Sequence, residues 1–143
     1  MIYSFLQNGD SAVTVQFKNE ISEEVNRRVT GLCNRIEAKH INGIIELVPT
    51  FASLTVFYDC TIISSKKLKK KIKSLINGGE CDVKSTAKVW NIPVCYDDEF
   101  ALDMKNVCSH TALEREEVIK LHTSKPYLIY MLGFLPGFAY LGG

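Results

Sequence analysis

Residues 44–58, IIELVPTFASLTVFY, contain the pattern that decides the fold. Two runs rich in β-branched and aromatic residues, 44–48 and 54–58, are typical of strands. The short segment between them, Pro49-Thr50-Phe51-Ala52, is a hairpin-like connection. The pattern therefore predicts two neighbouring antiparallel strands.

Helical patterns flank this hairpin on both sides. Ser22 is a predicted N-cap, followed by Glu23 and Glu24 in the first turn, where the helix dipole favours acids. The apolar face of this first helix holds Val25, Val29, Leu32, Cys33 and Ile36. Ser64-Ser65 begins a second helix, which ends at Asn77-Gly78-Gly79. Its apolar face holds Leu68, Ile72, Leu75 and Ile76.

Two further strands are predicted outside the helices. Residues 12–17 alternate with period two, and residues 88–94 form a second extended apolar run. The resulting order, βαββαβ, predicts an α+β fold with a ferredoxin-like domain. Polar residues 79–86 are the best linker candidate, so we expect an N-terminal domain over 1–86 and a second domain over 87–143. Helices near 101–108 and 114–122 and a strand at 127–132 are expected in the second domain.

The segment 131–143, MLGFLPGFAYLGG, interleaves glycines with aromatic rings. Pro136-Gly137 is the pair expected at the centre of a type II turn. One interpretation is a loop whose amides bind a carboxylate, a phosphate or a partner's backbone; the other is a tight turn with core aromatics. The candidate binding residues are Gly133, Phe134, Pro136, Gly137, Phe138, Tyr140, Gly142 and Gly143.

This glycine–aromatic segment, written GF-x-PGF-x-YLGG, resembles the signature of the family of KipI and the 5-oxoprolinase B subunit, also described as allophanate hydrolase subunit 1 and as carboxyltransferase subdomains C and D. Gly9-Asp10-Ser11-Ala12 and Asn26-Arg27-Arg28-Val29 resemble its opening, and Gly43 to Pro49 with Ser53-Leu54 resemble its second strand pair. Residues 92–96 and 117–122 complete the series in order. The resemblance implies that 87–143 is the incomplete start of a cyclophilin-like β-barrel domain, truncated at its C-terminal side.

The resemblance also implies an activity and partners. It implies the B subunit of an ATP-dependent 5-oxoprolinase complex, which hydrolyses 5-oxoproline to glutamate together with a homologous C subunit and an A subunit. ATP would be used by the complex, because this chain has no P-loop. The alternatives are a KipI-type inhibitor of a sensor histidine kinase, which is a binding module, and a carboxyltransferase or allophanate hydrolase subunit 1-like component of urea metabolism.

His122 is the candidate catalytic residue. An imidazole at this position could transfer a proton near neutral pH, or it could simply be a histidine stabilised by a helix C-terminus. Residue type alone favours the second interpretation, and the family resemblance adds weight to the first. His40 and His110 have no partner pattern.

Composition narrows the remaining classes. A net charge of +1 gives no electrostatic case for nucleic acid or for an anionic membrane, and the six lysines within 66–73 fit the solvated face of a helix. The most apolar stretch, 127–141, is too short and too interrupted to span a bilayer. Five cysteines without a C-x-x-C pair favour free thiols in the cytoplasm and not a zinc site. A metal requirement of the complex stays open.

Overall fold

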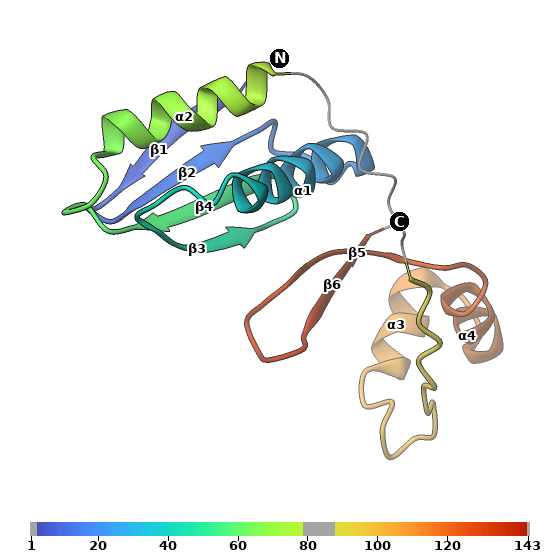
Figure 1. Cartoon of the computed structure of the whole chain (residues 1–143). Helices are drawn as coiled ribbons and strands as arrows, with labels where there is room; N and C mark the ends of the chain where they lie inside the picture. Colours follow the sequence, from blue (N-terminus) through green and yellow to red (C-terminus); the bar gives the residue numbers. More distant parts are fainter. Residues whose placement is uncertain (1–2, 79–87, 143) are drawn as a thin grey trace. The chain divides into compact units, whose positions relative to one another are not determined.

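The computed structural model describes residues 3–78 and 88–142 and divides the chain into two compact units. One unit combines the chain up to residue 84 with residues 129–143, and the other comprises 85–128. The elements, drawn in Figure 1, are β1 (Ser4–Asn8), β2 (Ala12–Gln16), α1 (Glu23–Ala38), β3 (Ile44–Pro49), β4 (Ser53–Tyr58), α2 (Ser65–Asn77), α3 (Met104–Thr111), α4 (Arg115–His122), β5 (Leu128–Leu132) and β6 (Ala139–Gly142).

The first unit is built on a four-stranded antiparallel sheet with the order β1-β2-β4-β3. β2 and β3 both run antiparallel to β4, which lies between them. They are therefore parallel to each other, and α1 connects them as a split β-α-β unit. The α+β class predicted from the sequence is confirmed.

The core lies between one face of this sheet and the two helices. Val13 pairs with Val56 and Val15 with Leu54, so these four side chains share one face of the sheet. They are completely buried, together with residues of both helices: Val29, Leu32, Ile36, Leu68 and Ile72. The periodic apolar faces predicted for the helices are confirmed, because burial of these stripes is what fixes the helices on the sheet.

The strand predicted over residues 88–94 is wrong. This segment forms no strand, and Val89, Trp90, Ile92 and Val94 are more than half exposed. The place beside β2 is taken by β1, a strand that the sequence pattern did not reveal. The described element order of the first unit is therefore ββαββα and not the predicted βαββαβ. An N-terminal strand lies at the sheet edge where the last strand was expected.

Gly43, at the turn between α1 and β3, requires the absence of a side chain. Its φ is +95°, and a Cβ there would lie 2.8 Å from Cγ2 of Ile63. The Gly43 carbonyl also accepts a hydrogen bond from Asp59 N at 2.8 Å. This hydrogen bond links the residue before β3 to the residue after β4.

The predicted boundary between residues 86 and 87 stays a prediction, and the linker expected over 79–86 lies outside the described residues. In the following segment, the structure describes α3, α4 and a two-stranded sheet formed by β5 and β6. The incomplete cyclophilin-like barrel also stays a prediction. Within the first unit, the buried Asn26 amide of α1 donates to the Tyr130 carbonyl of β5 at 2.9 Å.

Candidate functional site

His122 is the last residue of α4, and its imidazole is exposed. The helix begins after Glu114, whose backbone N–H donates to Glu117 Oε2 at 3.1 Å in the manner of a capping box. Thr123 N closes the last turn by donating to the Ile119 carbonyl at 3.0 Å. These local bonds fix both ends of α4 and therefore place His122 at its C-terminus.

Two tyrosines surround the His122 ring. The Tyr96 hydroxyl is hydrogen-bonded to Nδ1 of His122, and the two rings meet edge to face with centroids 5.9 Å apart. The Tyr127 ring lies on another side, also 5.9 Å away, at an interplanar angle of 40°. Because Nδ1 is engaged by Tyr96, Nε2 is the ring nitrogen left for an incoming group.

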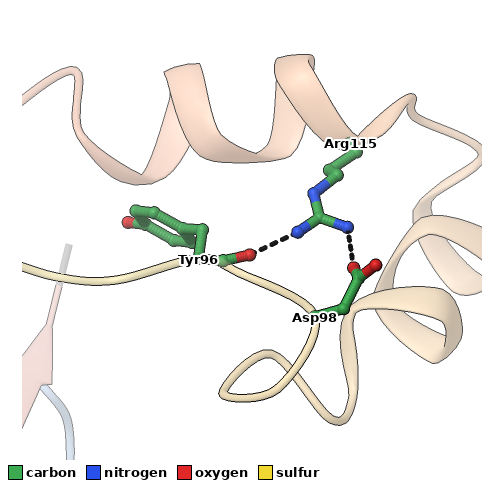
Figure 2. A network of polar contacts seen from close by, with 3 residues as sticks. All are labelled: Tyr96, Asp98 and Arg115. Carbon is green, nitrogen blue, oxygen red and sulfur yellow. Dashed lines mark hydrogen bonds and ion pairs between the residues drawn. The ribbon is translucent and has the colours of Figure 1, made fainter.

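Arg115 holds the loop that carries Tyr96. As Figure 2 shows, its guanidinium donates both to Asp98 Oδ1 and to the backbone carbonyl of Tyr96. Arg115 and His122 are seven residues apart, so they lie on the same side of α4 and both contact Tyr96. The hydrogen bond from Arg115 lowers the pKa of the Asp98 carboxyl below its usual range. The ion pair therefore links the loop to α4, and because it is exposed its contribution to stability is small.

These supporting residues were not identified from the sequence. Tyr96 stands in the stretch 92–96 that is quoted for the family resemblance, and Asp98 lies two residues after it. The spacing between Arg115 and His122 on a predicted helix was the available signal. Their common partner, Tyr96, is 19 residues before Arg115 and 26 before His122, distances that a local pattern does not bridge.

The glycine–aromatic segment forms the turn that the sequence predicted. Phe138 N donates to the Leu135 carbonyl at 3.0 Å, and Gly137, the third residue of the turn, has a φ of +79°. Both features define a type II turn with Pro136 and Gly137 at its centre. The turn connects β5 to β6 (Figure 1).

Most amides of this connection are already engaged. The N–H groups of Gly133, Leu135 and Phe138 all donate within the turn. Proline has no N–H, so Phe134 and Gly137 have the amides left for another acceptor. A phosphate cradle needs several convergent amides, whereas this turn leaves two.

The aromatic rings of the segment are presented to solvent. Phe138 meets Phe134 at 6.2 Å and Tyr140 at 5.2 Å, both close to edge to face. Phe134 is 87% exposed. Gly142 has a different role, because a Cβ there would collide with the Tyr130 ring of the adjacent strand.

His122 belongs to one compact unit and the turn between β5 and β6 to the other, and the structure describes each unit by itself. The roles of His122 and of the other candidate residues stay predictions. Gly143 lies outside the described residues. Within residues 3–78 and 88–142, no three His, Cys, Asp or Glu side chains gather as they would around a metal ion. In the same ranges, no helix is both long and apolar enough to cross a membrane.

Comparison with known proteins places this geometry in a family. The family model for the carboxyltransferase domain, subdomain C and D, matches residues 3–143. The 5-oxoprolinase B subunit of Bacillus subtilis (strain 168) is 40% identical over 152 residues, covering 99% of this chain and 63% of that protein. Among solved structures, PH0987 from Pyrococcus horikoshii is 39% identical with a TM-score of 0.51, covering 98% of this chain and 64% of that one. TTHA0988 is 32% identical with a TM-score of 0.72, covering 91% of this chain and 24% of that one.

The chain belongs to the carboxyltransferase subdomain C and D family. The resemblance to KipI and to the 5-oxoprolinase B subunit that the sequence motifs indicated is thereby confirmed. The chain spans about 63% of the length of the Bacillus subtilis protein. The fold and the family are established on this basis, and the activity of the whole protein is a matter for proposal.

Proposed function

We propose that this chain acts as the B subunit of an ATP-dependent 5-oxoprolinase complex, which hydrolyses 5-oxoproline to glutamate together with A and C subunits. The observation that carries the proposal is the 40% identity to a 5-oxoprolinase B subunit over 99% of the chain. Two other relatives with the same name, from Escherichia coli and Haemophilus influenzae, match 94% of the chain.

The chemistry of the proposed reaction assigns a role to His122. An unstrained lactam resists water, and ATP supplies the activation of its carbonyl in the complex. This chain has no P-loop, and its glycine turn leaves only two amides for an acceptor, so we assign ATP binding to another polypeptide of the complex. Nε2 of His122 would accept or donate the proton of the attacking water or of the leaving nitrogen. Tyr96 holds the ring in place through Nδ1.

We assign a binding role to the turn between β5 and β6, which would contact the substrate or a partner polypeptide. Exposed Phe134 and Phe138 offer apolar surface, and the free amides of Phe134 and Gly137 can donate to a carboxylate. Such donors would hold the part of the substrate that does not react, or the backbone of the C subunit. Either role uses the same exposed residues.

The test is His122→Ala in the assembled complex, with His110→Ala as a matched control from α3 of the same unit. Glutamate release from 5-oxoproline and ATP is measured. We expect kcat to fall about 10²- to 10⁴-fold for His122→Ala, the range for loss of a general acid or base, and to stay unchanged for His110→Ala. Full activity of an intact His122→Ala complex would remove the catalytic assignment. Binding of a kinase helical hairpin without any oxoprolinase activity would favour the inhibitor alternative instead.

A further inference from the structure

β1 is an edge strand with an unpaired outer side among the described residues. Tyr58 N donates to the Ser11 carbonyl and Phe17 N to the Ala52 carbonyl, so odd-numbered residues of β2 direct their backbone groups toward β4. Even-numbered residues of β2 therefore bond to their β1 partners, which are also even-numbered. It follows that the backbone N–H and C=O groups of Phe5 and Gln7 point away from the sheet.

A groove runs along this same edge. It has a volume of about 450 Å³ and is lined by Tyr3, Ser4, Phe5, Lys69, Lys70 and Lys73. The aromatic side chains pack against the core at its floor, and the three lysines come from one side of α2. The ion pairs between described residues include no lysine of α2. The groove thus combines unpaired strand amides with positive charge that no acid of the described chain neutralises.

We propose that this groove is a docking site for an extended acidic segment of a partner protein, which adds a fifth strand to the sheet beside β1. Strand addition uses the main-chain groups of an exposed edge for affinity and alternate side chains for specificity. Acidic side chains on one side of the added strand would face Lys69, Lys70 and Lys73. Side chains on its other side would continue the open face of the sheet next to Leu6, which is 48% exposed. This site is independent of His122 and of the proposed reaction.

Charge argues against the other occupants of the edge. In a second copy of this chain, α2 carries no acidic residue in its first turn and six lysines over residues 66–73. Pairing of two β1 strands would bring these like charges together, which is unfavourable. A nucleic acid would satisfy the lysines but would leave the strand amides of Phe5 and Gln7 without their proper partners.

The probe is a fluorescein-labelled hexapeptide that alternates glutamate and valine, and its binding to the chain is followed by fluorescence anisotropy. A peptide of the same sequence, N-methylated at alternate residues, keeps the charge but loses the amides that pair with β1. We expect the N-methylated peptide to bind at least about tenfold more weakly. Equal binding of both peptides, or binding of neither, would overturn the proposal.

Matched variants of α2 test the charge. Lys70→Glu with Lys73→Glu reverses two charges in the groove, whereas Lys67→Glu with Lys71→Glu makes the same change on positions outside it. We expect about tenfold weaker peptide binding for the first pair and less than about threefold for the second. Circular dichroism confirms that both variants fold.

Two further outcomes would count against the site. Tighter binding of a single-stranded oligonucleotide than of the acidic peptide would identify a nucleic-acid surface. The variant with Lys70→Glu and Lys73→Glu could dimerise while the unaltered chain binds no peptide. This result would show that the lysines only protect an edge strand from pairing.

Discussion

At the residue scale, Gly43 shows most directly how a backbone conformation limits which side chain fits. We predict that Gly43→Ala lowers the free energy of unfolding by about 1–3 kcal/mol, because an L-residue is strained at its φ of +95° and its Cβ would press on Ile63. Urea unfolding followed by circular dichroism measures the change.

Gly31 provides the matched control for this substitution. It lies inside α1, and a Cβ built there meets no atom within 4 Å. We expect Gly31→Ala to be neutral or to stabilise by about 0.5–1 kcal/mol, since alanine favours a helix interior. Equal destabilisation by both substitutions would contradict the proposed cause at Gly43.

Asp98 predicts a pH dependence at the same scale. Its pKa is lowered in the folded chain by the hydrogen bond from Arg115. The contribution of the pair to stability is therefore complete above the pKa of an unfolded aspartate, about 3.9, and is lost as the pH falls through the lower folded pKa. We expect wild type to exceed Asp98→Asn in stability at neutral pH, with a small margin because the pair is exposed.

Unfolding can be followed by the fluorescence of Trp90, the single tryptophan, because Trp90 lies in the same unit as Asp98. The difference between the two proteins should disappear in strong acid, where both side chains are neutral. The exposed neighbour Glu99 offers a control, and Glu99→Gln should show no such convergence. A margin that stays constant with pH would show that Arg115 does not act through the ionised carboxylate.

At the scale of elements, the two long helices begin in different ways. Ser64 caps α2 by accepting a hydrogen bond from Lys67 N at 3.4 Å, whereas Ser22, in the same position before α1, makes no such bond. We predict that Ser64→Ala lowers the free energy of unfolding by about 0.5–1 kcal/mol and that Ser22→Ala changes it much less. Thermal unfolding of both variants decides this, and a larger effect at Ser22 would contradict it.

The elements that the sequence pattern predicted correctly are those that contribute apolar side chains to the core. The strands around residues 12–17, 44–48 and 54–58 and both long helices formed where composition, alternation or helical spacing indicated them. Each of them packs apolar side chains into or against the core, β3 through the partly buried Ile44 and Leu47. β1 was missed because its residues are mostly exposed and carry little alternation. Residues 88–94 have a strand-like composition, but a strand also needs a partner, and the edge beside β2 is occupied by β1.

The shorter helices show a smaller error of the same kind. The helix expected over 101–108 begins at Met104, because Phe100 N and Ala101 N donate to the Asp97 carbonyl in a preceding turn.

For the candidate site, the type II turn could be predicted from two residues alone, Pro136 and Gly137. The support of His122 by Tyr96 and Arg115 could not, because these contacts join segments distant in the sequence.

At the scale of the whole molecule, the family match covers residues 3–143, and the chain spans about 63% of its Bacillus subtilis relative. The compact α+β core therefore provides the fold, while exposed Phe134 and Phe138 and the free edge of β1 are the surfaces through which it would join other polypeptides. The surface around Phe134 and Phe138 is part of the proposed 5-oxoprolinase function, whereas the groove beside β1 is proposed as a separate docking site.

The most direct measurement of the central proposal is glutamate release by the complex of this chain with A and C subunits, assayed with and without 5-oxoproline and ATP. We predict that release requires both compounds and all three polypeptides. Omission of this chain should abolish it, and addition of the purified chain should restore it. Undiminished release from the A and C subunits alone, or an assembled complex that releases no glutamate, would contradict the proposal.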